Sequence, residues 1–190
     1  MSKKIQQAFF IVRIKYWPNL VSSMRKIWFS IQGMKIGTDT RLPSIKVTWP
    51  HQVMIGKKCQ LEAGTVFKYD GIWSEGFSIK IEDNVFLGSG CEFNINIGIT
   101  IKQDANIASG CRFIDHDHGS VLGIRIGAQP SVRAAITIEE DVWLGVNVVV
   151  LKGVTIGSGS IVAAGAVVNR SIPENEIWGG VPAKFIKKRS

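Results

Sequence analysis

The sequence has few cysteines and histidines, and its first 35 residues contain no acidic side chain. Its three cysteines are odd in number and form no C-x-x-C pair, which argues against a disulfide framework and against a structural zinc site. Within the first 35 residues the longest run of large apolar residues, Phe9–Val12, is far shorter than the roughly 20 residues needed to cross a bilayer. The N-terminus also lacks the apolar core and cleavage site of a signal peptide, so we expect a cytoplasmic protein.

The net charge of +8 is concentrated at the N-terminus, where residues 1–35 contain seven basic and no acidic side chains. Apolar periodicity predicts helices over residues 3–16 and 19–32, split at Trp17-Pro18 because a residue before proline disfavours the helical conformation. Asn19 is the expected N-cap of the second helix. This basic amphipathic segment, residues 1–33, has two possible roles. It caps the open end of the fold or packs against a neighbouring subunit, or it binds the inner face of the membrane. No motif in it supports nucleic-acid binding.

The most regular stretch of the chain has a period of six residues. Every sixth residue from residue 138 to residue 168 is aliphatic: Ile138, Leu144, Val150, Ile156, Val162 and Val168. A six-residue period predicts a β-helix, in which each hexapeptide forms one short strand and one corner. The pattern resembles that of the hexapeptide-repeat acyltransferases. This resemblance implies an all-β fold, a left-handed parallel β-helix, which is a hand that the period alone cannot show.

The same period extends backwards through three earlier coils. Their predicted inward positions are Ile55, Leu61, Phe67, Ile81, Leu87, Phe93, Ile101, Ile107 and Phe113. The three cysteines fall at small corner positions of these coils, which favours buried structural thiols over a catalytic one. We therefore assign residues 34–172 to the β-helix and residues 173–190 to a C-terminal tail.

Breaks in the period mark insertions at 69–77, 94–98 and 114–135. Loops on a rigid scaffold commonly carry function, and the longest of these contains two of the three histidines. His116 and His118 alternate there with Asp115 and Asp117. A neutral histidine whose other ring nitrogen is oriented by a carboxylate suits a general base, although a solvated polar loop gives the same spacing.

The segment after this loop, Ile136-Thr137-Ile138-Glu139-Glu140-Asp141-Val142-Trp143-Leu144-Gly145, carries the closer resemblance. It is similar to the maltose and galactoside O-acetyltransferases and to related enzymes of surface polysaccharides. A gapless count from Ile99 places His118 on the catalytic histidine of that family, with His116 as its partner or as a substrate contact. Gly119 replaces the proline that commonly follows.

The resemblance also implies contacts for the acceptor. Asn94 and Asn96 interrupt the coil before the catalytic loop, and Asn96 matches an acidic substrate-contact position of the galactoside enzymes. Trp143 is expected to line the acceptor or pantetheine site. The alternative is that it is an ordinary aromatic residue on the surface of the coil. Gly88 stands where the family commonly has asparagine, which leaves the acceptor sugar open.

The family binds acetyl-CoA in a groove between neighbouring β-helices, which implies a homotrimer. The backbone near Gly145 and Val146 matches the donor to the thioester oxygen, and Ala163 and Ala164 match the pantetheine channel. The positions expected to meet the adenosine phosphates are Asn169, Arg170, Lys184 and Lys187. A solvated basic tail is the alternative for these cations.

The sequence thus predicts an acetyl-CoA-dependent O-acetyltransferase that acts on a sugar hydroxyl in surface-polysaccharide or glycolipid synthesis. The alternatives are an N-acetyltransferase of an amino sugar and a non-catalytic β-helix scaffold at the membrane. We expect no metal, because His116 and His118 share one loop and His51 lies several coils away, whereas zinc in this fold takes histidines from separate coils.

Overall fold

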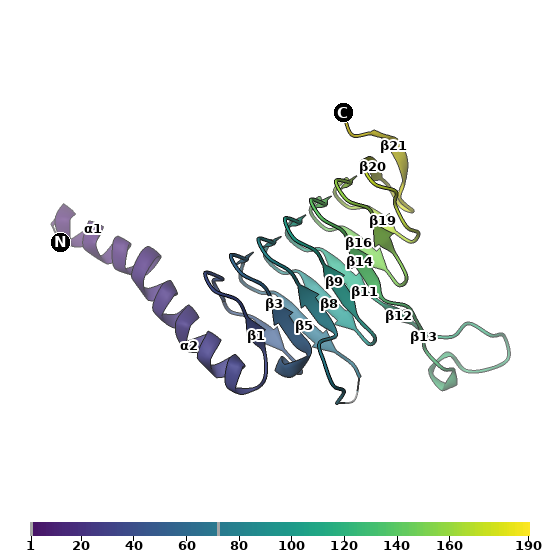
Figure 1. Cartoon of the computed structure of the whole chain (residues 1–190), viewed down its shortest axis with the longest axis horizontal. Coiled ribbons are helices and arrows are strands. Elements are labelled where there is room, and N and C mark those ends of the chain that lie inside the picture. Colours follow the sequence, from purple (N-terminus) through teal and green to yellow (C-terminus); the bar gives the residue numbers. More distant parts are fainter. Residues whose placement is uncertain (1, 72) are drawn as a thin grey trace.

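A computed structural model describes residues 2–71 and 73–190, apart from the side chains of residues 14 and 15. Most of the described chain forms a column of triangular coils, and a long helical rod projects from its N-terminal end (Figure 1). Each complete coil contributes one short strand to each of three sheets, so strand order in every sheet follows coil order. The predicted β-helix is confirmed.

The three sheets are built almost entirely from short parallel strands. Sheet 1 consists of β1 (Lys35–Ile36), β3 (Val53–Ile55), β6 (Ile79–Ile81), β9 (Ile99–Ile101), β14 (Ile136–Ile138) and β17 (Thr155–Ile156). Sheet 2 consists of β4 (Gln60–Leu61), β7 (Phe86–Leu87), β10 (Asn106–Ile107), β15 (Trp143–Leu144), β18 (Ile161–Val162), β20 (Glu176–Gly179) and β21 (Lys184–Lys188). Sheet 3 consists of β2 (Lys46–Val47), β5 (Val66–Tyr69), β8 (Glu92–Ile95), β11 (Arg112–Ile114), β16 (Val149–Leu151) and β19 (Val167–Val168).

The core is a set of ladders of like residues in equivalent positions of successive coils. All the inward positions predicted from the six-residue period are buried. In sheet 3, Phe67, Phe93 and Phe113 stack with ring centroids 4.9 and 4.8 Å apart. Burial of such rings is the main favourable term that holds one coil on the next.

The three cysteines occupy the tight corners, as predicted. Each is completely buried, and the thiols of Cys59 and Cys111 donate to the carbonyl oxygens of Glu82 and Gly145 at 3.0 and 3.2 Å. Burial raises the pKa of the Cys59 thiol, because the thiolate would lose its hydration there. These sulfurs therefore fill the corners and are inaccessible to a substrate, which confirms the structural interpretation.

The predicted break at Pro18 is wrong, because the N-terminal segment is one continuous helical rod (Figure 1). It runs from α1 (Lys3–Ile11) through a π-helical turn (Val12–Tyr16) into α2 (Trp17–Ile31). Pro18 lies in the first turn of α2, where a missing N–H is tolerated, and the widened π-turn precedes it. Asn19 is not an N-cap. Its side chain instead accepts a hydrogen bond from Arg41 at 2.6 Å.

The rod is joined to the first coil through α2. The hydroxyl of Ser22 accepts the backbone N–H of Leu42 at 2.8 Å, and Lys26 donates to the carbonyl of Thr40 at 3.2 Å. Phe29 packs against the core beside them. Within the described residues, no helix has the length and apolar character required to cross a membrane.

The C-terminal residues add to sheet 2 before the chain reverses. β20 pairs in parallel with β18, and β21 returns antiparallel to β20. Two 3-10 turns, Pro50–Gln52 and Ile126–Ala128, and a small hairpin of β12 (His116–Asp117) with β13 (Val132–Arg133) complete the elements.

The stacked phenylalanines allow a test of the core. Phe93→Ala should lower the free energy of unfolding by about 3–5 kcal/mol, because it leaves a cavity between two buried rings. Phe185→Ala, on the half-exposed strand β21, is the control and should change stability by about 0.5 kcal/mol or less. Urea unfolding followed by circular dichroism measures both, and equal losses would contradict the ladder as the main source of stability.

Candidate active site on the loop edge

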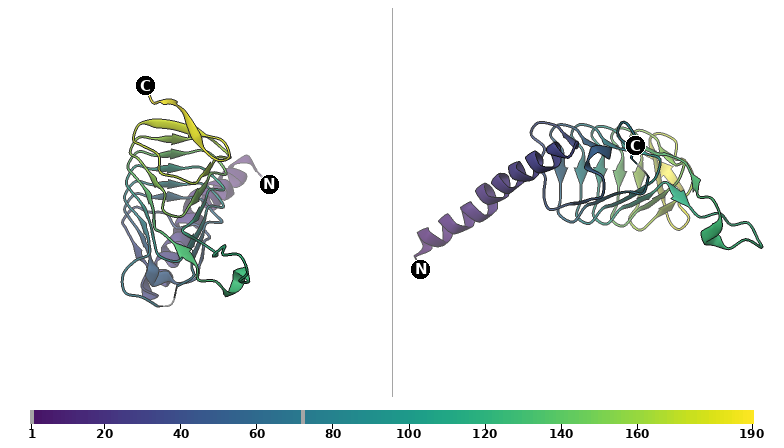
Figure 2. Two further views of the ribbon diagram at one scale, coloured as in Figure 1. Left: turned by 90° about the vertical axis from the view of Figure 1, so that its right-hand side faces the viewer. Right: turned by 90° about the horizontal axis from the view of Figure 1, so that it is seen from below.

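All the insertions lie on one edge of the β-helix. Residues 48–52, 70–78, 96–98 and 115–135 each connect a strand of sheet 3 to the next strand of sheet 1. We call this edge the loop edge. The last of these loops begins with the β12–β13 hairpin and extends well away from the coils (Figures 1 and 2). Three of these loops overlap the predicted insertions at 69–77, 94–98 and 114–135, whereas the loop at 48–52 was not predicted. Stacking of the coils brings all four side by side.

Asp115 is a fully buried carboxylate at the start of the longest loop. Its oxygens accept the backbone N–H groups of Asn96, Ile97 and Gly98 at 2.7–2.8 Å. Three charge-assisted hydrogen bonds compensate for the lost hydration of the carboxylate. The short 96–98 loop is thus shaped around this side chain, which in turn anchors the base of the long loop.

Asp115 also holds the ring of His116. Its Oδ1 lies 2.9 Å from the Nδ1 atom of His116, whose side chain is 20% exposed. An ionised carboxylate has no proton to donate, so Nδ1 donates and a neutral ring keeps its lone pair on Nε2. The Nε2 atom lies 4.0 Å from the Asp70 carboxylate, beyond hydrogen-bond distance. His118 is exposed, and the described part of the chain offers its ring no hydrogen bond.

The other predicted acceptor residues of this region lie around the two histidines. The Asn94 amide oxygen accepts from Lys68 at 3.3 Å, and that of Asn96 accepts from Arg133 at 2.8 Å. Asp117 points to the other side of the hairpin and forms an ion pair with Lys152. The structure therefore brings six predicted site residues to one edge: Asn94, Asn96, Asp115, His116, Asp117 and His118.

Asp70 is a polar neighbour of His116 that the sequence analysis missed. It follows β5 and forms an ion pair with Lys68 at 2.7 Å. The signal was present, because Asp70, Asn96 and His116 each lie three residues after a phenylalanine of the core ladder. By the same count, Asp115 occupies the inward position that Tyr69 and Ile95 fill in the two coils before it. A carboxylate in a core position was the sharper clue to the site.

An aromatic cluster lies further along the loop edge. The ring of His51 stands edge-on to Trp49 at 5.6 Å and stacks on Trp73 at 5.9 Å. Both tryptophans are exposed, whereas His51 Nε2 is buried and has no hydrogen-bond partner among the described residues. The buried side chain of Gln52 holds the 70–78 loop against this cluster through the Ser74 carbonyl at 2.6 Å and the Ser78 hydroxyl at 2.7 Å.

The residues predicted to meet the coenzyme are distributed over the molecule. Gly145, Val146, Ala163 and Ala164 lie where sheet 2 turns into sheet 3, which we call the sheet 2–3 edge. The exposed Trp143 precedes them on sheet 2. The backbone N–H of Gly145 is already bonded to the Val162 carbonyl at 2.8 Å, so only the Val146 N–H can serve as the predicted donor.

The residues predicted to meet the adenosine phosphates belong to two segments at the C-terminal end of the β-helix. Asn169 and Arg170 follow β19 on the loop edge, and the Arg170 guanidinium lies over Trp178 at 5.3 Å. Lys184 and Lys187 are exposed on β21.

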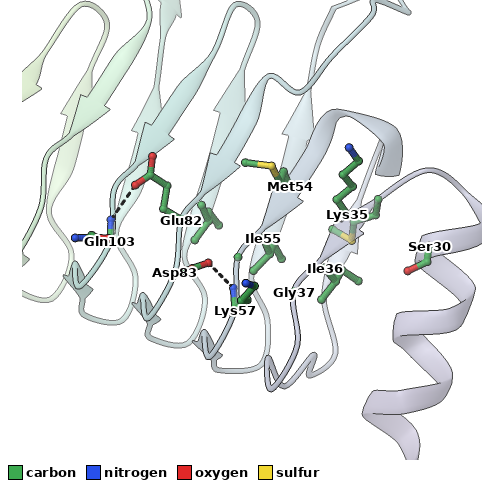
Figure 3. Close-up of a pocket in the computed structure, with 13 residues that line it drawn as sticks. Ser30, Lys35, Ile36, Gly37, Met54, Ile55, Lys57, Glu82, Asp83 and Gln103 are labelled. Atoms are coloured by element: carbon green, nitrogen blue, oxygen red, sulfur yellow. Dashed lines mark hydrogen bonds between the residues drawn. The ribbon is translucent and has the colours of Figure 1, made fainter.

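One hollow lies away from the histidines. It encloses about 650 Å³ between the end of α2 and the first coils, at the corner where sheet 1 turns into sheet 2 (Figure 3). The Asp83 carboxylate there accepts the Lys57 N–H at 2.7 Å, and Glu82 accepts that of Gln103 at 3.3 Å. Since these acids are already paired, we do not place the reaction there. No cluster of three or more potential metal ligands occurs among the described residues.

The role of Asp115 can be tested by removing one acceptor. Asp115→Asn should lower the free energy of unfolding by about 1–3 kcal/mol, because the new amide NH₂ faces backbone donors that need an acceptor. Asp117→Asn, at an exposed carboxylate of the same hairpin, should change it by about 0.5 kcal/mol or less. Chemical denaturation measures both. An unchanged Asp115→Asn variant would contradict the anchoring role.

Comparison with known proteins bears on this arrangement. Residues 78–111 match the family described as hexapeptide repeat of succinyl-transferase, and residues 135–170 match bacterial transferase hexapeptide (six repeats). The chain is 40% identical over 118 residues to the lipopolysaccharide biosynthesis O-acetyl transferase WbbJ of Escherichia coli, covering 58% of this chain and 60% of that relative. It is 31% identical over 173 residues to the colanic acid biosynthesis acetyltransferase WcaF of Escherichia coli, covering 90% of this chain and 79% of the relative.

Solved structures share the fold. The hexapeptide-repeat acetyltransferase VCA0836 of Vibrio cholerae superimposes with a TM-score of 0.59 at 25% identity, over all of this chain and 94% of that one. The N-acyltransferase AntD of Bacillus cereus reaches 0.73 at 18% identity, over 87% of this chain and 88% of that one. The coils accordingly form a left-handed parallel β-helix. Since WcaF is 31% identical and matched over 79% of its length, the chain belongs to the hexapeptide-repeat acetyltransferase family.

Proposed function

We propose that the protein transfers an acetyl group from acetyl-CoA to a sugar hydroxyl during synthesis of a surface polysaccharide or glycolipid. The observation that carries the proposal is the paired histidines on the loop edge, one of them held by a buried carboxylate. WbbJ and WcaF are named for lipopolysaccharide and colanic acid biosynthesis, which supports a glycan acceptor. A structure of VCA0836 contains acetyl-CoA, which supports the donor.

In the proposed reaction His118 takes the proton of the acceptor hydroxyl as the oxygen attacks the thioester carbonyl carbon. The backbone N–H of Val146 donates to the oxyanion of the tetrahedral intermediate. The carbon–sulfur bond then breaks, the acetyl group stays on the sugar oxygen, and the proton passes to the coenzyme thiolate. We keep His118 as the base because the family pattern places it there and its ring is exposed, and His116, which Asp115 orients, is its partner or a substrate contact.

The acceptor site proposed here extends along the loop edge. Asn94, Asn96 and Asp70 offer hydrogen-bonding groups next to His116. Further along, the exposed faces of Trp49 and Trp73 offer large amphipathic surfaces of the kind that contact ligands at interfaces. Trp143, on sheet 2, reaches this acceptor site only from a neighbouring chain.

A complete site needs two chains. The histidines follow the end of β11, whereas Val146 precedes β16, which pairs with β11 along its length. The two groups thus lie at opposite ends of sheet 3, separated by at least the width of its three-residue strands, about 10 Å at 3.3 Å per residue. The base must reach the attacking hydroxyl, and the oxyanion donor must reach the carbonyl oxygen of the same thioester, each within about 3 Å. The loop edge of one chain packed against the sheet 2–3 edge of the next satisfies this, with Ala163 and Ala164 beside the pantetheine.

The base is tested by paired substitutions. His118→Ala should lower kcat by about 10²–10⁴-fold, the usual effect of losing a general base, with little change in the affinity for acetyl-CoA. Release of the coenzyme thiol, measured across a panel of sugars, nucleotide sugars and amino sugars, gives the rate and the acceptor. His116→Ala should mainly raise the KM for the acceptor.

Three results would change this assignment. A kcat effect confined to His116→Ala would transfer the base to His116, which Asp115 already orients. Normal activity in both variants would refute the mechanism. If only amino sugars are turned over, the proposed O-acetyl transfer would be replaced by N-acetyl transfer.

The shared site is tested by complementation. His118→Ala removes the base, and Ala164→Trp fills the exposed channel on the sheet 2–3 edge, so each variant alone should be inactive. Co-expressed chains that mix at random in a trimer should recover about one intact site in four. Light scattering gives the assembly mass. A monomer that turns over acetyl-CoA, or mixed trimers without activity, would contradict a site between chains.

A further inference from the structure

We propose that the rod of α1 and α2 lies along an anionic membrane surface with its apolar face in the lipid headgroup region. This inference goes beyond the transfer reaction and does not depend on it. It rests on how α2 is oriented on the first coil, on the exposure of α1, and on the charge of the rod.

The apolar face of α2 points away from the protein. The face on the first coil consists of Ser22, only 5% exposed, with Lys26 and Phe29. On the opposite face, five large apolar side chains are 56–77% exposed: Leu20, Met24, Ile27, Trp28 and Ile31. A surface helix ordinarily buries its apolar face against the core and presents its polar face to water. This helix does the reverse, so its apolar face requires a partner from outside the chain.

The outward face of α2 is apolar and also contains a shallow hollow. Trp17, Met24, Trp28 and Ile31 border a shallow hollow of about 630 Å³ whose lining is almost entirely carbon. Contiguous exposed apolar surface of this kind on a soluble chain marks an interaction site. If the segment only capped the open end of the fold, α2 would bury this apolar face against the first coil, and it does not.

α1 has no support from the rest of the chain. All its residues are exposed, and it projects away from the coils in two perpendicular views (Figures 1 and 2). Ile5, Phe9, Phe10 and Ile11 are among its exposed side chains. Most of the stability of helices in proteins comes from packing of an amphipathic face, and the exposed face of α1 lacks such packing within the described residues. An external surface that accepts apolar groups supplies this packing.

Charge selects an anionic lipid surface over a second copy of the same rod. Residues 1–35 contain seven basic and no acidic side chains, so two rods side by side would bring like charges together without any counter-charge. Lys3, Lys4 and Arg13 are exposed along the rod and can meet lipid phosphates. Trp17 and Trp28 are aromatic side chains of the type that favours the headgroup level.

The same charges favour a rod that lies on the membrane over one that crosses it. Basic residues recur from Lys3 to Lys26, and a cation at the centre of a bilayer is costly. A helix of 29 residues extends about 43 Å, enough for several turns of apolar contact along a surface. The β-helix is attached at one end of this rod and therefore stays in water near the membrane.

Co-sedimentation of the full-length protein with phosphatidylcholine vesicles, with and without phosphatidylglycerol, tests the proposal. We expect binding only with phosphatidylglycerol present, weakening as salt is added. The Trp28→Ser variant should bind the anionic vesicles at least tenfold more weakly. Its unfolding midpoint should be unchanged, because the Trp28 indole points away from the coils. Trp73→Ser is the matched control, because Trp73 on the loop edge is 66% exposed against 64% for Trp28. Its binding should equal that of the unchanged protein.

Several outcomes would overturn the proposal. The first is full-length protein that ignores anionic vesicles at low salt, and the second is equal loss in the Trp28→Ser and Trp73→Ser variants. The third is an assembly, detected by light scattering, that is larger than expected and that dissociates in the Trp28→Ser variant. In that case the apolar face of α2 would join copies of the chain. Acetyl transfer to a soluble acceptor should be unchanged in Trp28→Ser, so failure of the membrane proposal is distinguishable from failure of the proposed reaction.

Discussion

The stacking of each coil on the next is the constraint on which the rest of the structure depends. A hexapeptide strand cannot bury its aliphatic residue alone, and the residue becomes inaccessible only when the equivalent residue of the next coil covers it. The Phe67–Phe93–Phe113 ladder shows this directly, with rings about 5 Å apart through three coils. Inward positions are therefore tightly restricted, whereas a corner can take an insertion without disturbing its neighbours. The loops accumulate on one edge because they extend the same corner of successive coils.

That regularity also explains how residues from separate loops come together in one candidate site. Positions three residues after the phenylalanine ladder are brought into line, so Asp70, Asn96 and His116 become neighbours from three different coils. Asp115 occupies an inward position that an apolar residue fills in the two previous coils. A buried charge is tolerated there only because three backbone N–H groups bind it, and the same carboxylate then orients a histidine. Anchoring of the loop and orientation of the ring are one interaction.

The chain presents surfaces that it does not complete itself. The predicted catalytic groups and the predicted oxyanion donor lie at opposite ends of sheet 3, and the apolar face of α2 points away from the core. Both features reflect the shape of the fold. A narrow prism has flat faces and separate edges, so one edge cannot contact another edge of the same chain. Our proposals of a site shared between chains and of a membrane-bound rod give these surfaces partners of different chemistry: a second β-helix and an anionic lipid surface.

The sequence alone determined the β-helix, its inward residues, the corner cysteines and the loop that carries the histidines, because a six-residue period records local geometry that repeats in every coil. Only the tertiary structure decided that Asp115 holds His116, that Asp70 lies beside them, and that Gly145 has no free N–H. These contacts join residues from different coils, whose register must be known first. The helical rod shows the same limit. The amphipathic pattern of the rod was recognisable in the sequence, but Pro18 did not break the helix as predicted. Nothing local specifies which face of the rod meets the coils, because Ser22 and Lys26 bond to residues 20 and 14 positions away.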